Sequence, residues 1–146
     1  MDATYLAFDY GRRRIGVAVG SRRSGRAQPL KVLACAGGRP DWRAIDALVA
    51  AWSPEALVVG LPLDMDGGRN PLTRAARRFG ETLRQRYNRP VHMVDERLTS
   101  RSARATMAAS GVSAPRMRRR GVDHYAAGEI LDTFLQQLDR PLHDPD

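Results

Sequence analysis

The sequence contains little cysteine, little lysine and no long apolar run. Cys35 is the only cysteine, which excludes an intrachain disulfide and a thiolate zinc cluster, and the three histidines lack metal-ligand spacing. The longest apolar stretch, around residues 56–63, is far too short to span a membrane. Asp2 and Asp9 stand near the start, and no basic segment precedes an apolar one. We therefore expect no signal peptide, no membrane partner and a cytoplasmic location.

Positive charge is carried almost entirely by arginine, because Lys31 is the only lysine among 24 basic residues. The formal net charge is +8 at pH 7. A guanidinium presents a planar set of donors that matches phosphate oxygens, so this excess favours a polyanionic partner. A genomic preference for arginine codons is an alternative explanation of the arginine-to-lysine ratio, but it leaves the net charge unexplained.

Length and composition predict one domain. The chain has 146 residues, of which 42% are hydrophobic and 27% charged, as is typical of globular proteins. We expect the domain to cover 1–138, with 139–146 as a frayed tail. A monomer or a weak homodimer fits this size.

Three strand-like runs open the chain, and helices and strands then alternate. Two strands joined by a short turn predict a hairpin, and Pro29 starts the third strand near a sheet edge. Asn70 and Pro71 are typical of the N-cap and first position of a helix. The predicted elements are strands 4–10, 14–20 and 27–35, helix 39–54 with Trp42, Ile45, Leu48, Val49 and Trp52 on its apolar face, strand 55–61, helix 70–87 with Leu72, Ala76, Phe79, Leu83 and Tyr87 on its apolar face, strand 90–96, helix 99–110, loop 111–121 and helix 122–138. This order predicts an α/β fold with a mixed five-stranded sheet, three antiparallel strands followed by parallel ones, and helices on both faces.

Three acidic residues stand at the ends of predicted elements. Asp9 ends the first strand, Glu96 follows the strand at 90–96, and Asp123 opens the last helix. Loops beyond the carboxyl ends of strands converge in open α/β sheets, so Asp9 and Glu96 are expected to lie together if the first strand is the neighbour of the strand at 90–96, with Asp123 reaching them from the last helix. At an effective dielectric near 20, each pair of carboxylates about 4 Å apart costs on the order of 4 kcal/mol, so such a cluster persists only if protons or cations neutralise it. Oxygen ligands favour Mg²⁺ or Mn²⁺, and a pair of such ions supports in-line phosphodiester hydrolysis.

Each acid also has a purely structural explanation. Asp9 fits a turn residue that caps the hairpin. Glu96 fits a surface ion pair with Arg97 or Arg101, which contributes little to stability. Asp123 fits a favourable charge at the positive end of a helix dipole.

Basic and glycine-bearing segments beside these acids are candidate phosphate contacts. The loop before Asp123 and the first hairpin turn carry clustered arginines, and Arg97 follows Glu96 directly. The candidate nucleic-acid contacts are Arg12, Arg13, Arg14, Arg97, Arg116, Arg118, Arg119 and Arg120. The segment 58–73 predicts a strand, a loop and a capped helix whose N-terminus suits either a phosphate or an ordinary connection. Its Asp64 and Asp66, next to two glycines, are typical turn formers. Tyr10 and Tyr125 are the available stacking residues, and core or rim positions fit them better.

Four motifs at compatible spacings resemble the YqgF/RuvX family over nearly the whole chain: "FDYGRRRIGVAVG", "VVGLPLDMDGG", "DERLTS" and "GVDHYAAGEIL". Proteins of that family are described as pre-16S ribosomal RNA nucleases and as similar to Holliday-junction resolvases, with a ribonuclease H-like fold. The resemblance assigns the family's acidic positions to Asp9, Glu96 and Asp123. It implies an endonuclease that uses Mg²⁺ or Mn²⁺, one or two ions, to cut structured RNA, with maturation of the 5′ end of 16S ribosomal RNA as the expected step.

Two positions depart from the family pattern. Gly121 precedes Asp123 by two residues where relatives often carry a basic residue just before the last motif, and Ala127 stands where many such nucleases have a fourth acid. Three ligands are therefore visible, and use of a single metal remains open. The resemblance leaves two other functions open, a resolvase of branched DNA and a non-catalytic RNA-binding factor acting on ribosomal particles. The first motif is also similar to the first phosphate loop of ATPases of the actin type. Those enzymes close two domains around the nucleotide, and 146 residues supply only one, so this function is disfavoured.

Overall fold

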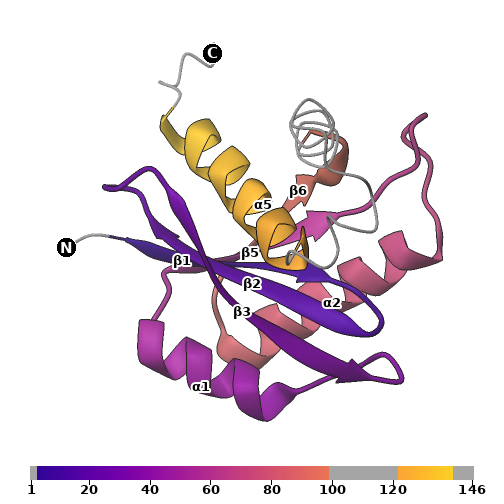
Figure 1. Ribbon diagram of the computed structural model, residues 1–146, viewed down its shortest axis with the longest axis horizontal. Helices are drawn as coiled ribbons and strands as arrows, with labels where there is room; N and C mark the ends of the chain where they lie inside the picture. The colour runs from indigo at the N-terminus through magenta and orange to yellow at the C-terminus, as the bar shows by residue number, and fades with distance from the viewer. Residues whose placement is uncertain (1–2, 99–121, 140–146) are drawn as a thin grey trace.

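The computed structural model describes residues 3–98 and 122–139 of the chain, and side chains within 3–98 and 126–138. Figure 1 shows a central sheet with helices on both sides. The elements are β1 (Thr4–Tyr10), β2 (Arg14–Ser21), β3 (Ala27–Ala36), β4 (Arg39–Pro40), α1 (Trp42–Trp52), β5 (Ala56–Leu61), α2 (Pro71–Tyr87), β6 (Val91–Asp95) and α5 (Val122–Asp139). The helix predicted at 99–110, the loop 111–121 and the tail 140–146 lie outside the described residues.

The sheet combines antiparallel and parallel pairing, as the sequence predicted. Its strand order is β4-β3-β2-β1-β5-β6, with β1 to β4 paired antiparallel and β5 and β6 parallel to β1. Within the described part of the chain the sheet has six strands, one more than predicted. The additional strand is the two-residue β4, which pairs with the end of β3 after Gly37 and Gly38 turn the chain with φ of 57° and 79°.

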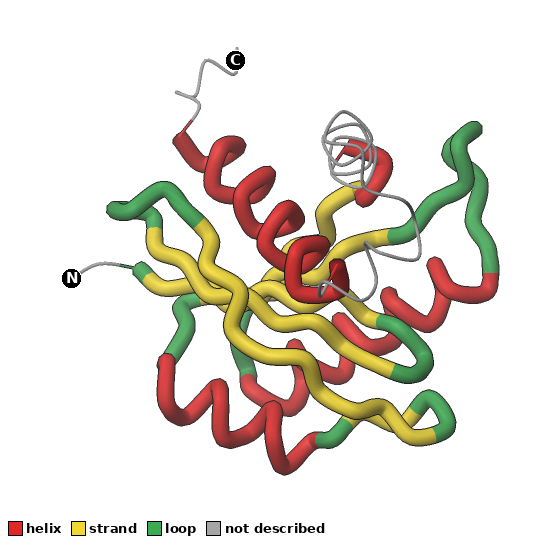
Figure 2. The backbone as a smooth tube through the Cα atoms, in the orientation of Figure 1, coloured by secondary structure: helices red, strands yellow, loops and turns green. Residues whose placement is uncertain are grey.

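Side chains alternate between the two faces of β1 and divide the core into two clusters. Leu6, Phe8 and Tyr10 join the cluster covered by α1 and α2. Tyr5 and Ala7 join the cluster covered by α5 (Figure 2). By the same alternation, Asp9 belongs to the face that α5 covers.

On the face opposite α5, the start of α2 and the end of α1 lie where the sequence signals predict them. Asn70 and Thr73 form a reciprocal capping box at the start of α2, with Pro71 at the first helical position. Left-handed Ser53 ends α1, one residue before Pro54. The predicted apolar face of α2 is confirmed: Ala76, Phe79 and Leu83 are buried, and Leu72 and Tyr87 pack partly buried against them.

The prediction that Trp52 belongs to the apolar face that α1 packs against the core is wrong. Ile45 and Val49 are buried, whereas Trp52 is 41% exposed. It is the last residue of the helix, where the chain leaves for β5, so it extends past the cluster that the two inner residues join. Apolar spacing alone does not show where a helix passes the edge of the core.

Helix α5 runs toward the edge of the sheet where β1 and β5 end. Phe134 packs edge-on against Tyr5 near the start of β1, with ring centroids 5.2 Å apart. One turn earlier in α5, Ile130 reaches Gly60 near the end of β5. The N-terminal end of α5 therefore points to the carboxyl ends of these strands.

Among the described residues, no helix is both long and apolar enough to cross a membrane.

Candidate functional site

Asp9 lies on the face of β1 that α5 covers, next to the C-terminal end of β5. It is half-buried and is paired with Gly16 of β2. In the parallel pairing of β1 with β5, Phe8 stands opposite Val59, so Asp9 and Gly60 are the next residues of the two strands. Because side chains alternate, both positions face α5. Asp9 thus lies beside a residue that has no side chain.

Glu96 occupies the space that Gly60 leaves. It is the first residue after β6 and begins a helical turn over residues 96–98. A β-carbon on Gly60 would stand 2.6 Å from Oε2 and 2.9 Å from Cγ of Glu96, closer than real contacts allow. Asp9 and Glu96 therefore lie on one face, on either side of Gly60. The expected direct adjacency of their two strands is wrong, because β5 lies between β1 and β6; the two residues instead share one face of the sheet because Glu96 reaches over Gly60 of β5.

Gly60 is a residue whose importance the sequence analysis missed. It interrupts the continuously apolar run of β5, whose burial is complete along all its residues. An isolated glycine inside a buried strand is a signal of close approach by another group. Here that group is the Glu96 side chain, together with Ile130 Cδ1 at 2.5 Å from the same β-carbon position.

Burial makes the Glu96 carboxyl an unusual acid. Loss of hydration raises the pKa of Glu96 to about 7, and the negative charge of Asp95 adds to the effect. A positive charge beside this carboxylate would lower the pKa again, because it favours the ionised form.

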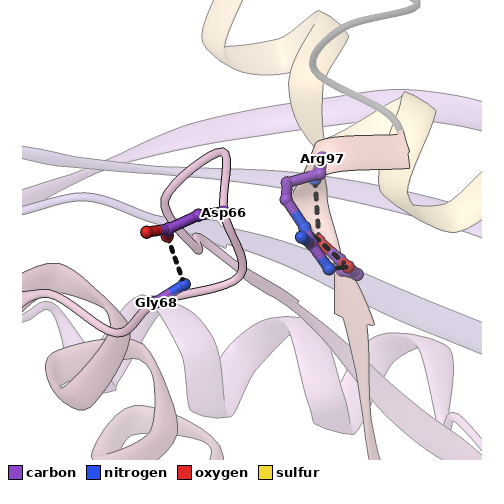
Figure 3. Close-up of polar contacts among 4 residues, drawn as sticks. Asp66, Gly68 and Arg97 are labelled. Atoms are coloured by element: carbon purple, nitrogen blue, oxygen red, sulfur yellow. Dashed lines mark hydrogen bonds and ion pairs between the residues drawn. The ribbon is translucent and has the colours of Figure 1, made fainter.

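Arg97 pairs with Asp95, its neighbour but one, and this pair differs from the surface pair considered for Glu96. Nη2 of Arg97 lies 2.6 Å from Oδ2 of Asp95, and the Arg97 backbone N–H donates to Oδ1 at 2.9 Å. These bonds hold the pKa of Asp95 below its ordinary value. Figure 3 shows Arg97 near the turn that carries Asp66 and Gly68, and a β-carbon on Gly67 would stand 3.3 Å from Nη1 of Arg97.

Asp123 is the second residue of α5, and its side chain is outside the described part of the chain. Positions 123, 127 and 130 follow the spacing of one helix face. Ala127 and Ile130 on that face are buried against the sheet. Position 123 is two turns, about 10 Å, before Ile130, in the direction of the edge where Asp9 and Glu96 lie. Among the described side chains, which do not include that of Asp123, no three His, Cys, Asp or Glu lie close enough together to hold a metal ion.

The predicted arginine contacts of the first hairpin lie around Asp9. Arg12 and Arg13 are exposed in the turn between β1 and β2, and Arg14 is exposed at the start of β2. With Asp9, Gly11 and Leu72 they line one open hollow. Arg116, Arg118, Arg119 and Arg120, predicted as contacts in the loop before α5, lie outside the described residues.

The loop between β5 and α2 uses its polar groups locally. Asp66 Oδ1 accepts from the Gly68 N–H at 2.8 Å, and Asp64 Oδ1 accepts from Asn70 Nδ2 at 2.9 Å. The two aspartates are thus turn formers, as expected from the neighbouring glycines. Tyr10 is a core residue whose hydroxyl donates to the Gly38 carbonyl at 3.3 Å, so the core interpretation of this tyrosine is confirmed. The Tyr125 side chain is not described.

Comparisons with known proteins bear on the family and the fold of the chain. A family model described as "RuvX: Holliday junction resolvase" matches residues 3–137. Proteins named "Putative pre-16S rRNA nuclease" from Marinobacter nauticus and from an Enterobacter species are 48% and 42% identical, over 90% and 94% of this chain and 92% and 99% of their own lengths. The structure of T. thermophilus RuvC in complex with a Holliday junction substrate superimposes with a TM-score of 0.54 at 15% identity, over 94% of this chain and 96% of that one. This likeness confirms the ribonuclease H-like fold.

Proposed function

Since the chain belongs to the RuvX family, as its four motifs predicted, we propose that it is a metal-dependent endonuclease that hydrolyses phosphodiester bonds in structured RNA. Asp9, Glu96 and Asp123 are its proposed catalytic residues. The observation that carries the proposal is the placement of Asp9 and Glu96 on either side of Gly60, at the sheet edge to which α5 points.

The donor set fits a hard divalent cation. Two carboxylates on adjacent positions of one face supply the oxygen ligands that Mg²⁺ and Mn²⁺ prefer, and a third acid on α5 would complete the set. Asp9, Glu96 and Asp123 are the residues that would hold one or two such ions. When bound, the ions supply positive charge that stabilises the pentacovalent phosphate and the attacking and leaving oxygens.

The chain's own residues have two tasks in this proposal. The carboxylates of Asp9 and Glu96 are fixed by strand ends rather than by long loops, so the scissile phosphate is oriented with little reorganisation. Arg12, Arg13 and Arg14 bind the phosphates next to the scissile one through charge-assisted hydrogen bonds. Arg97 reaches the same region from the other side of Glu96 while Asp95 holds its guanidinium. Arg116, Arg118, Arg119 and Arg120 are proposed to bind phosphates before the last helix.

The names of the relatives favour precursor 16S ribosomal RNA as substrate. We propose ribosomal particles as the setting and the cytoplasm as the location. We infer 5′-end maturation as the step. A branched DNA junction is the second candidate, favoured by the family description and by the likeness to RuvC. Both substrates present the same phosphodiester to the site, so the chemistry is shared. A non-catalytic RNA-binding role is the remaining alternative.

One purified preparation tests these alternatives. The protein is incubated with precursor 16S ribosomal RNA and with a four-way DNA junction, with Mg²⁺, with Mn²⁺ and with chelator. We expect cleavage of the RNA only with metal, and its loss in Asp9→Asn, Glu96→Gln and Asp123→Asn. Glu81→Gln is the matched control, because Glu81 is an exposed carboxylate on α2 that pairs with Arg84. Junction cleavage without RNA cleavage would favour the DNA function, and binding without any cleavage would favour the non-catalytic one.

A further inference from the structure

A second basic surface continues from the Asp9 hollow around the edge of the sheet. It is a hollow between the N-terminal half of α2 and the turn joining β3 to β4, which we call the α2 groove; its lining includes Tyr10, Arg12, Arg13, Gly38, Arg74 and Arg78. Arg12 and Arg13 line the Asp9 hollow as well. The two hollows therefore adjoin at Arg12 and Arg13, with Asp9 lining one and Tyr10 lining the other.

The arginines of α2 fall into two groups. Arg84 is paired with Glu81, and Arg86 makes two bonds of 2.8 Å to Asp46. The guanidinium groups of Arg74 and Arg78, exposed and nearer to Asp9, make no ion pair or hydrogen bond with any described side chain. Arg77, the fifth arginine of α2, is exposed and lies outside the groove, so two of the three guanidinium groups of the helix without a described partner line the groove.

The walls of the α2 groove suit an anionic chain. None of the described residues that line it is acidic. Gly37 and Gly38 form the wall opposite α2 and contribute no side chains to it. Arg74 and Arg78 are one helical turn, about 6 Å, apart on the same face of α2.

Arg12 and Arg78, which line the α2 groove from different elements, both act on the hydroxyl of Tyr10, which also lines it. Burial is the main reason that the pKa of Tyr10 is raised, with the Cys35 thiol adding to it, and both Arg12 and Arg78 act in the opposite direction. Arg12 belongs to the β1–β2 turn and Arg78 to α2. The two guanidinium groups therefore face the same small region from two elements.

We propose that the α2 groove binds the sugar-phosphate backbone of the substrate strand that leads away from the scissile phosphate, with Arg74 and Arg78 as phosphate contacts. This inference rests on the proposed nuclease function, because it takes the hollow at Asp9 as the place of the scissile phosphate. Planar guanidinium groups bind phosphate oxygens in pairs, and the groove offers such groups on both of its walls. Contacts of this kind recognise the backbone and not the base sequence.

The test is a binding titration of the full chain without divalent ions, followed by fluorescence anisotropy. The probes are short, end-labelled single strands of RNA and of DNA with the same sequence. We expect Arg74→Gln with Arg78→Gln to lower affinity on the order of tenfold for each guanidinium group removed. The slope of log affinity against log salt should fall by about 0.7 for each phosphate that is no longer neutralised, or about 1.4 for the double variant.

A second double variant controls for net charge. Arg43→Gln with Arg77→Gln removes the same charge from exposed positions on α1 and α2 that line neither this groove nor the Asp9 hollow. We expect its affinity and salt slope to stay close to those of the parent. Arg74→Lys with Arg78→Lys should recover part of the affinity, because it restores charge without the planar donors. Circular dichroism melting curves verify that all variants fold.

Several results would contradict the proposal that the α2 groove binds phosphates. Equal reductions in affinity in the two glutamine double variants would show a general charge effect, and an unchanged groove variant would show that no phosphate binds there. A reduction confined to RNA or to DNA would contradict binding through the phosphates that they share. These results are separable from the nuclease proposal, because metal-dependent cleavage by the parent, abolished in Asp9→Asn, would still support that function. Conversely, groove-dependent binding by a parent that never cleaves would support the groove and reject the nuclease.

Discussion

Glu96 lies across Gly60, with its Oε2 atom 2.6 Å from the point where a β-carbon on that glycine would stand. This relationship links β5 to the end of β6 and sets the position of the carboxylate beside Asp9. It gives a specific requirement for glycine at a position with an ordinary strand conformation. The requirement is for space and not for a left-handed backbone.

Gly60→Ala should therefore reduce both stability and cleavage. The added methyl group would collide with Glu96 and with Ile130 Cδ1, so the variant is expected to lose about 1–3 kcal/mol in the free energy of unfolding, measured by urea denaturation. Cleavage should fall at least about tenfold, because the carboxylate must move. Gly128→Ala is the control: among the described residues no atom outside its own stretch of helix lies within 4 Å of the new methyl group, and a helical alanine should stabilise by about 1 kcal/mol.

Removing the buried charge at Glu96 should stabilise the metal-free protein. Glu96→Gln keeps the shape of the side chain and ends both its desolvation and its repulsion with Asp95. We expect a higher melting temperature than the parent in chelator, and a smaller or reversed difference when Mn²⁺ is added, because only the parent gains from binding the ion. A melting temperature lowered equally with and without Mn²⁺ would contradict this account.

The pair formed by Asp46 and Arg86 connects α1 with α2 and should respond to acid. Hydrogen bonds from Arg86 and then Tyr87 lower the pKa of Asp46 from 3.8 to about 2. A lowered pKa means that the contribution to stability is present above about pH 4 and is lost as the pH falls toward 2. We expect the parent to exceed Asp46→Asn in urea midpoint at pH 6, with the gap closing between pH 4 and 2. A gap independent of pH would show that the charge contributes nothing.

Thr73 should be the most sensitive hydroxyl of α2. Its side chain is fully buried, donates to the Pro62 carbonyl and accepts from the Asn70 backbone N–H at 3.0 Å. Thr73→Val leaves both partners without a bond and should cost about 1–3 kcal/mol by urea denaturation. Thr82→Val, whose exposed hydroxyl donates to the Arg78 carbonyl at 2.9 Å, should change stability by less than about 0.5 kcal/mol.

The main elements could be predicted from the sequence because their signals are local. Alternation in β1 separates Phe8 and Tyr10 from Ala7 and Asp9, and Asn70 with Pro71 determines the start of α2. The strand β4 could not be predicted in this way, because its two residues are held only by pairing with β3.

The candidate site was predictable only in part, for a similar reason. Asp9 could be recognised as a candidate site residue because it stands at the end of a predicted strand, and Glu96 because it follows one. The pairing of Arg97 with Asp95 was not predictable, since Asp95 and Glu96 both stand within two residues of Arg97 and the choice depends on where the folded chain directs each carboxylate. The role of Gly60 depends on a contact between elements that are 36 residues apart in the sequence.

The central claim is that the acids at positions 9, 96 and 123 together hold a divalent ion, and Mn²⁺ binding followed by electron paramagnetic resonance tests it without any nucleic acid. The parent is predicted to bind Mn²⁺, and Asp9→Asn, Glu96→Gln and Asp123→Asn each to weaken binding at least about tenfold, while Glu81→Gln binds as the parent does. Equal Mn²⁺ affinity in the parent and in all three acid variants would contradict the claim.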